Sequence, residues 1–329
     1  MHIKPLLSNL PSPPNGKTGW PWDEEFKPQH KLCRKYQDYP TISLITPVLN
    51  QGNSIEETIR SVLLQNYPNL EYYIIDGGSS DQTIKIIQKY SNWLSGWISE
   101  KDSGQSNAIN KGFRMCTGEI FNWLCSDDYL AKGAIWKISQ FMNNHPQIDL
   151  VYGDCILRIE HESNIRQTIG RSSKDPIIYP YLTEIWQPSC FYRTRLIKRI
   201  NLLREDLHYC MDRELWNYIY SVSSNWKRVP FVISTYRFTG NNKSVTGRMK
   251  IINELCIIYR KYYLGIIDAS SILTKCWIPL VINSNKSSNP IILSICILFK
   301  KTITLLLLIV FPKKHISSLQ KEFYKYFAW

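Results

Sequence analysis

The sequence lacks several motifs that would assign it to common classes of protein. Its nine cysteines include no CxxC pair, so a zinc site or a dithiol redox site has no support. No G-x-G-x-x-G follows the first predicted strand and no G-x-x-x-x-G-K-S/T occurs, which disfavours a dinucleotide-binding fold and a P-loop. The first residues contain no long apolar core with a small-residue cleavage site. We therefore expect no secretory signal and a reducing, cytoplasmic compartment.

The chain is also short of acidic residues. It has 27 Asp and Glu against 40 Lys and Arg, which gives a net charge of +13. Beyond residue 249 the only acids are Glu254, Asp268 and Glu322, and the cations there flank the most apolar part of the chain. Positive charge suits nucleic acid, anionic lipid or a phosphorylated substrate. No nucleic-acid recognition motif accompanies it, so we expect no nucleic-acid partner.

An uninterrupted apolar run long enough to cross a membrane is missing as well. Residues 291–311 are predominantly apolar, but Lys300 and Lys301 lie near the midpoint, where each Lys would cost roughly 2.5–3.5 kcal/mol on insertion. We expect residues 249–329 to form a helical, basic and apolar C-terminal region. Two alternatives remain for it: short helices that lie on an anionic membrane surface, or a helix pair that packs on the rest of the protein.

Strands and helices alternate from residue 41 onward. Short apolar runs predict strands at residues 42–46, 72–75, 97–99 and 120–124, and residues at helical spacing follow each of them. The first apolar run is broken by Pro47 and ends at Asn50-Gln51-Gly52, and we expect Ser54 with Glu57 to form a capping box for the first helix. Such alternation predicts an α/β fold, in which a mainly parallel sheet is flanked by helices and ligands bind beyond the carboxyl ends of its strands.

A polar side chain follows each predicted strand, and the fold would bring these side chains together. They are Asn50, Asp76, Asp102 and the pair Asp127-Asp128. Each alone has an ordinary alternative as a turn residue or helix cap, and Gly77-Gly78 is either a tight turn or a close approach to a ligand. Adjacent carboxylates fixed by a buried strand are, however, a typical way to hold Mg²⁺ against substrate phosphates.

Asp212 is a second acidic candidate. Leu215, Trp216 and Ile219 lie three, four and seven positions after it, so Asp212 is predicted on the apolar side of a helix and Glu214 on the polar side. A buried carboxylate needs a partner or a function. Asp212 is therefore either paired with a nearby Arg or a general base.

Several segments occur in the order typical of a known family. They are TISLITPVLNQG, EYYIIDGGSSDQT, SEKDSGQSNAINKGF, TGEIFNWLCSDDYL, WQPSCFYR and MDRELW. Over residues 41–220 the chain resembles the family 2 glycosyltransferases of the GT-A fold, in particular bacterial enzymes of cell-surface polysaccharide synthesis. The motif Trp20-Pro21-Trp22 is similar to one bacterial subgroup.

The resemblance implies a hexosyltransferase-type enzyme that moves a sugar, with inversion, from a nucleotide-diphosphate sugar to a hydroxyl of a lipid-linked or growing cell-surface glycan, using Mg²⁺ or Mn²⁺. It implies an irregular arm at residues 1–40, a GT-A (Rossmann-like) catalytic domain at 41–248 and the C-terminal region at 249–329. The protein would act at the inner face of the plasma membrane. The alternative is a non-catalytic nucleotide-sugar-binding or scaffold protein that keeps the fold.

The resemblance also implies roles for individual residues. The nucleotide sugar would contact Pro47, Asn50, Asp76, Gly78, Asp102, Gln105, Asn110 and Lys111. Asp127 would approach the ribose or sugar, and Asp128 would bind the metal. Gln187 would lie near the acceptor or donor sugar, and Asp212 would deprotonate the acceptor.

The chain departs from the family pattern at two places. Ser126 stands where the family often has Asp or Asn. Residues 239–244 contain no His, although many relatives supply one there as a metal ligand. Contact with the diphosphate would then fall to Lys243.

Overall fold

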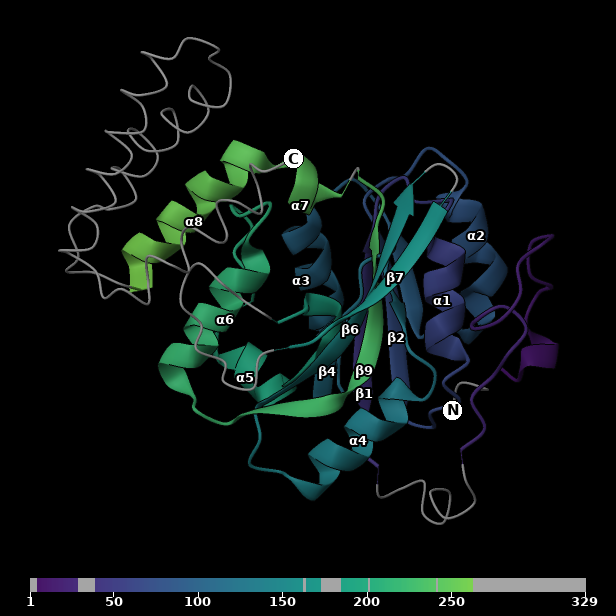
Figure 1. Ribbon diagram of the computed structural model, residues 1–329, viewed down its shortest axis with the longest axis horizontal. Coiled ribbons are helices and arrows are strands. Elements are labelled where there is room, and N and C mark those ends of the chain that lie inside the picture. The colour runs from purple at the N-terminus through teal and green to yellow at the C-terminus, as the bar shows by residue number, and fades with distance from the viewer. Residues whose placement is uncertain are drawn as a thin grey trace, which may run out of the picture. The chain divides into compact units, whose positions relative to one another are not determined.

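The computed structural model describes residues 5–28, 39–161, 164–172, 185–200, 202–240 and 242–262 (Figure 1). By compactness the chain divides into two units. The first comprises Met1–Pro176, Glu184–Met211 and Val222–Gly240, and the second comprises Ile177–Thr183, Asp212–Ser221 and Asn241–Trp329. The domain boundaries at residues 41 and 249 stay predictions. The apolar segment at 291–311 lies outside the described residues.

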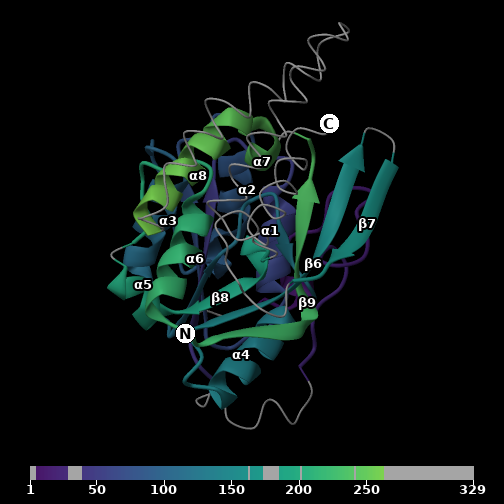
Figure 2. The same ribbon diagram turned by 60° about the vertical axis from the view of Figure 1, so that its left-hand side comes forward.

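The first unit is built on one mixed sheet, which has nine strands in the described part of the chain. Its order is β3-β2-β1-β4-β8-β6-β9-β5, with β7 beside β6. The strands are β1 Ile42–Val48, β2 Leu70–Asp76, β3 Gly96–Ser99, β4 Ile120–Trp123, β5 Tyr129–Leu130, β6 Leu150–His161, β7 Asn164–Gly170, β8 Cys190–Arg193 and β9 Trp226–Phe238. The first four are mutually parallel, β6 and β9 pair in parallel, and β6 and β7 form an antiparallel hairpin (Figure 2).

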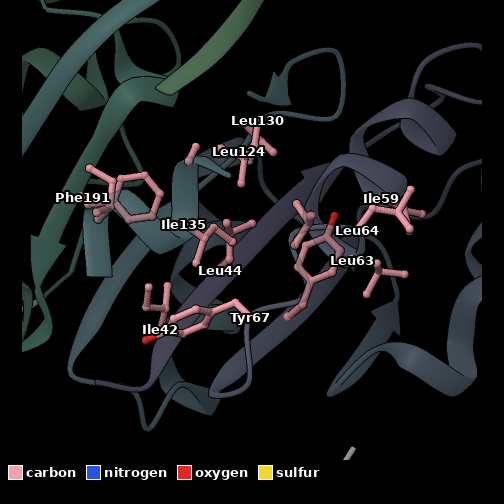
Figure 3. Packing of buried hydrophobic residues seen from close by; sticks show 14 of the residues in the cluster. Ile42, Leu44, Ile59, Leu63, Leu64, Tyr67, Leu124, Leu130, Ile135 and Phe191 are labelled. Atoms are coloured by element: carbon pink, nitrogen blue, oxygen red, sulfur yellow. The ribbon is translucent and has the colours of Figure 1, made fainter. Parts of the chain in front are cut away.

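Helices cover both faces of the parallel half of this sheet (Figure 1). They are α1 Ile55–Leu63, α2 Thr83–Tyr90, α3 Gln105–Met115, α4 Ala134–Asn144 and α5 Thr194–Arg199, with short 3₁₀ turns at Leu7–Asn9, Ser91–Trp93 and Gln187–Ser189. Alternate residues of β1 point to opposite faces. Ile42 and Leu44 pack with Ile59 of α1 in the main core (Figure 3). On the other face a Cβ at Gly112 of α3 would lie 2.9 Å from Ile45 Cγ2, so this glycine lets α3 approach the sheet. The predicted α/β fold is confirmed.

One local prediction is wrong, and one strand is longer than its apolar run. Strand β1 continues past Pro47 to Val48, with Pro47 opposite Ile75 of β2. The pairing of β1 with β4 already stops at Ile45, so the missing N–H of Pro47 leaves no gap on that side. The capping box does not form, because the Ser54 hydroxyl donates to Gln51 Oε1 at 3.1 Å instead of capping α1.

A buried arginine connects the N-terminal arm to the rest of the first unit by hydrogen bonds. Arg60 of α1 has no exposed surface. Its guanidinium donates to the carbonyl oxygens of Pro11 (2.8 Å), Pro21 (3.1 Å) and Trp22. The arm in turn reaches the sheet, because Trp20 Nε1 donates to the Leu130 carbonyl at 2.8 Å. A buried charge is tolerated here because three carbonyl oxygens of the arm surround it.

We expect Arg60→Met to lower the free energy of unfolding by at least about 2 kcal/mol, since a buried carbonyl left without its donor costs about 1–3 kcal/mol. Urea unfolding measures this change. Arg195→Met serves as the control, because that side chain is 60% exposed in its ion pair with Asp149, and it should shift stability by less than about 0.5 kcal/mol. Equal effects of the two substitutions would contradict the role given to Arg60.

The second unit contributes three described helices: α6 Met211–Val222, whose end residues belong to the first unit, α7 Lys243–Thr246 and α8 Arg248–Tyr262. Glu214 of α6 is buried, and it accepts hydrogen bonds from Lys261 and from the Tyr262 hydroxyl (2.8 Å) of α8. None of the helices in the described ranges is both long and apolar enough to cross a bilayer.

Candidate active site

The polar residues that follow β1, β2, β3 and β4 leave the sheet at one edge. Val48 pairs with Asp76, Asp76 pairs with Ser99, and Ile45 pairs with Trp123. Parallel strands in this register bring their carboxyl ends together. The structure therefore gathers the loops that carry Asn50, Asp76, Asp102 and Asp127-Asp128, as the sequence predicts.

Asp76 organises the turn after β2. Its buried carboxylate accepts hydrogen bonds from the backbone N–H groups of Gly78 (3.1 Å) and Ser79 (3.0 Å) and from the Ser99 hydroxyl (2.7 Å). Asn50 has a left-handed φ of 51° and ties its own loop to this turn, since its Oδ1 accepts from Ser80 N at 2.8 Å. Both residues thus have clear structural tasks, and their contact with a nucleotide stays a prediction, as does that of Pro47.

Two glycines shape the space between β2 and β3. A Cβ at Gly77 would lie 2.6 Å from Asp102 Oδ2, so no larger residue fits there without a shift. Gly78 has φ of +88°, a conformation that L side chains rarely adopt. Asp102 is half-buried, and its Oδ1 accepts from Gly104 N at 2.9 Å at the start of α3. The roles of Gly78 and Asp102 at a nucleotide sugar stay predictions.

Two predicted pocket residues of α3 have partners that occupy their polar atoms. Asn110 is buried and its amide donates to the Leu203 carbonyl and to Glu205 Oε1, both at 2.9 Å. Lys111 pairs with Glu100 Oε1 at 2.7 Å. Asn110 therefore positions the segment around Leu203. The predicted contact of Asn110 and Lys111 with the nucleotide sugar stays a prediction.

Helix α1 holds the loop that carries the acidic pair. The Thr58 hydroxyl lies 3.0 Å from the Ser126 carbonyl oxygen and 2.7 Å from that of Asp128. Ser61 Oγ accepts from the backbone N–H of Leu130 at 3.1 Å. Because α1 is itself packed into the core, these contacts fix the loop against the edge of the sheet.

Asp128 is an almost fully buried carboxylate of this site. Its side chain is 2% exposed. Oδ1 accepts the backbone N–H of Arg237 from β9 at 3.1 Å, and the described part of the chain gives Oδ2 no hydrogen bond. Burial raises the pKa of Asp128 well above its usual range, and the neighbouring charge of Asp127 raises it further against the opposing effect of Arg237. A cation bound at Oδ2 would compensate for both the burial of Asp128 and the neighbouring charge of Asp127.

The donor atoms around Asp128 fit a divalent cation. Ligand atoms of Cys125, Asp127 and Asp128 all lie within 4.8 Å of one another. Carboxylate oxygens suit Mg²⁺ and Mn²⁺, and sulfur suits softer divalent ions. These three residues could hold a metal, and the roles of Asp128 as its ligand and of Asp127 at the ribose or sugar stay predictions.

Cys125 and Arg237 are site residues that the sequence reasoning missed. Cys125 directly follows a predicted buried strand and stands two residues before Asp127, which is a signal that the sequence offers for it. Arg237 forms an ion pair with Glu57 of α1, and Arg158 joins the same carboxylate at 3.2 Å. No local pattern predicts this cluster, because Glu57 and Arg237 are 180 residues apart.

The predicted Gln105 and Gln187 meet at Cys125. Gln105 Nε2 donates to Cys125 Sγ at 3.1 Å, and the thiol lies 3.8 Å from Gln187 Oε1. Gln187 Nε2 also donates to the Trp123 carbonyl at 2.7 Å at the end of β4. Both glutamines are therefore at the edge that carries the acidic pair, and their contacts with a sugar stay predictions.

Asp212 lies in the first turn of α6, in the second unit, and is half-buried. Burial raises its pKa, and the charge of Glu254 adds to this, whereas the charge and backbone N–H of Arg213 lower it. The prediction that placed Glu214 on the polar side is wrong, because Lys261 and Tyr262 cover that carboxylate. The role of Asp212 as a base stays a prediction.

Comparison with known proteins identifies the family. The sequence pattern described as Glycosyl transferase family 2 matches residues 43–211, just over half of the chain. The chain belongs to this family. As a family 2 glycosyltransferase it is a transferase, and the resemblance seen in the sequence is confirmed.

Individual relatives agree with this assignment. The protein is 29% identical over 192 residues to an uncharacterized glycosyltransferase of Rickettsia typhi, covering 56% of this chain and 60% of the relative. It is 31% identical over 165 residues to a PGL/p-HBAD biosynthesis glycosyltransferase of Mycobacterium tuberculosis, covering 49% of this chain and 62% of the relative. The chain thus spans less than two thirds of the length of these relatives.

Solved structures share the GT-A fold. TarS of S. aureus in complex with UDP-GlcNAc matches with a TM-score of 0.55 at 18% identity, covering 68% of each chain. The mannosyltransferase PcManGT of Pyrobaculum calidifontis, in complex with GDP-Man and Mn²⁺, matches with a TM-score of 0.54 at 16% identity, covering 89% of each chain. At these identities the likeness shows the fold.

Proposed function

We propose that this glycosyltransferase moves a sugar, with inversion, from a nucleotide-diphosphate sugar to a hydroxyl acceptor at the edge that carries Asp127-Asp128. The observation that carries the proposal is Asp128, a buried carboxylate beyond the carboxyl end of a parallel strand, with one oxygen that no hydrogen bond from the described residues reaches. Sites in open α/β sheets lie beyond such strand ends. The nucleotide-sugar and Mn²⁺ complexes of the similar folds support this choice of donor and metal.

The acidic loop, which comprises Cys125 to Asp128, and the residues that contact it have separate roles in this proposal. Asp128 would hold Mg²⁺ or Mn²⁺, which when bound offsets the charge that develops on the leaving diphosphate. Asp127, first expected at the ribose or sugar, would share this metal, because its ligand atom lies within 4.8 Å of that of Asp128. Thr58 and Arg237 keep Asp128 in place through its carbonyl and Oδ1. The turns held by Asp76 and Asn50 supply the nucleotide end of the pocket.

Asp212 acts as the general base in this proposal. It accepts the proton of the acceptor hydroxyl while the new carbon–oxygen bond forms at the anomeric carbon and the bond to the diphosphate breaks. One displacement of this kind inverts the anomeric centre, as in the two-carboxylate logic of inverting glycosidases. A base with a pKa above the usual Asp range is a better proton acceptor.

A donor panel tests the proposed function. The full chain is incubated with Mn²⁺ and UDP-, GDP- and dTDP-sugars, with and without glycan or lipid-linked acceptors, and released nucleoside diphosphate is measured. We expect turnover of at least one donor, lost in Asp128→Asn. Metal-dependent binding of a donor without turnover with any acceptor would instead indicate a non-catalytic nucleotide-sugar-binding protein.

We also infer a peripheral membrane contact, because a lipid-linked or surface glycan is assembled at a membrane and residues 249–329 carry the excess of cations. Basic residues near an anionic leaflet contribute about 1 kcal/mol each. The full chain should sediment with anionic vesicles and not with neutral ones, and removal of residues 285–329 should abolish sedimentation. Unchanged sedimentation of the shortened chain would contradict the contact.

A further inference from the structure

Cys125 occupies an unusual place for a small apolar residue. The residues before it, from Phe121 to Leu124, are buried, whereas Cys125 is half-buried and emerges from the sheet beside the acidic pair. Its sulfur and the carboxylates of Asp127 and Asp128 lie within 4.8 Å of one another. The other cysteines of the described part whose side chains are placed are buried.

The position of this sulfur is fixed by its neighbours. Gln105 of α3 donates an amide hydrogen to it at 3.1 Å, and a thiolate can accept that hydrogen as well as a thiol can. Gln187 Oε1 lies 3.8 Å away on the 3₁₀ turn Gln187–Ser189. The Gln187 amide itself donates to the Trp123 carbonyl, so this neighbour of the sulfur is fixed to the end of β4.

The carboxylate of Asp128 points to a cation at the same place. It is almost fully buried, and in the described ranges its Oδ2 has no hydrogen bond. Carboxylate oxygens alone would suit Mg²⁺, which favours near-octahedral oxygen ligands and keeps several waters. A sulfur ligand changes this preference, because soft thiolates select softer metals.

We propose that Cys125 Sγ is a third ligand of the metal site, and that this site prefers ions that accept sulfur, such as Co²⁺ or Cd²⁺, over Mg²⁺. The thiol releases its proton to solvent as the sulfur–metal bond forms, so no oxidant or reductant is needed. This inference rests on the proposed function, because it names the ligand set of that same site. It makes Cys125 a specificity-determining residue for the metal.

Absorption spectroscopy with Co²⁺ tests the ligand directly. The full chain is titrated with CoCl₂ in the presence of UDP or GDP, and the near-ultraviolet sulfur-to-cobalt charge-transfer band is recorded. We expect the band in the wild type and in Cys116→Ser, a buried cysteine of the same unit, and its loss in Cys125→Ser. The affinity for Cd²⁺ should fall at least about tenfold in Cys125→Ser, at the lower end of what loss of a ligand-orienting group costs. The affinity for Mg²⁺ should stay unchanged.

The outcomes separate this inference from the proposed function. Mn²⁺ binding that disappears in Asp128→Asn, together with no cobalt–sulfur band and equal Cd²⁺ affinity in Cys125→Ser, would overturn the sulfur ligand and leave the metal site intact. Failure of the wild type to bind any divalent ion with either nucleotide would overturn both. If Cys125→Ser does not fold, protection of Cys125 from iodoacetamide by Cd²⁺ in the wild type, located by mass spectrometry, supports the ligand, and unprotected modification overturns it.

Discussion

Replacing Asp128 by asparagine is expected to abolish sugar transfer and, at the same time, to stabilise the metal-free protein. The loss of activity should be roughly 10³-fold or more, because several kcal/mol of charge stabilisation by a metal correspond to about that factor in rate. Asparagine keeps an oxygen for the backbone N–H of Arg237 but carries no charge. Steady-state kinetics and thermal unfolding without metal measure the two effects.

The gain in stability follows from the sign of the pKa shift. A carboxyl whose pKa is raised in the folded state binds more protons folded than unfolded, so the stability of the metal-free protein falls as pH rises from about 4 through the folded pKa. The stability of Asp128→Asn does not fall in this way with rising pH, because asparagine has no proton to lose in this range. Its advantage should therefore be present at neutral pH and absent below the usual Asp pKa.

Asp149 provides a control of opposite sign. Burial opposes ionisation there, but the Ser223 hydroxyl and Arg195 together lower the pKa of Asp149. Its stabilising effect is present above the usual Asp pKa and lost as pH falls. Asp149→Asn should thus destabilise the protein at neutral pH. An Asp128→Asn variant that is equally destabilised, or that retains transfer, would contradict the account of Asp128.

Asp212→Asn is expected to lower kcat by about 10²–10⁴-fold, the usual contribution of a general base, while donor and metal binding persist. The base must be ionised, and burial raises its pKa. In the wild type kcat/KM should therefore fall with decreasing pH through a value above the ordinary Asp pKa of about 3.9. Steady-state kinetics and calorimetry of nucleotide binding test the variant, and the pH dependence of kcat/KM for the acceptor at saturating donor tests the titration.

Glu214→Gln on the same helix is the matched control for Asp212. Glu214 is buried and held by Lys261 and Tyr262, so its loss should reduce stability and leave the acidic limb of the profile in place. If Asp212→Asn retained its kcat, or if the limb moved in Glu214→Gln instead, the base would have to be another residue.

The parallel half of the fold and the place of the site could be predicted from local sequence. Continuous apolar runs are typical of strands buried on both faces. The carboxyl ends of such strands meet at one edge, so Asn50, Asp76, Asp102 and Asp128 could be grouped before any coordinates. Asp76 shows the limit of this reasoning, since a carboxylate at a strand end can equally serve the turn that follows.

Features that depend on long-range pairing were not predictable. Strand β9 contains Pro230 and several charged residues, and it forms through pairing with β6 and β5. The ion pair between Arg237 and Glu57 needs that strand, and it replaces the capping box expected for Glu57. Likewise Glu214 faces inward only because α8 supplies Lys261 and Tyr262.

The central claim is that the acidic loop binds a nucleoside diphosphate through a divalent cation. Isothermal titration of the full chain with UDP and GDP, with and without Mn²⁺, tests it most directly. The account predicts binding of at least one of them that requires Mn²⁺ and is lost in Asp128→Asn but retained in Asp212→Asn. Nucleotide binding that is independent of both Mn²⁺ and Asp128 would contradict it.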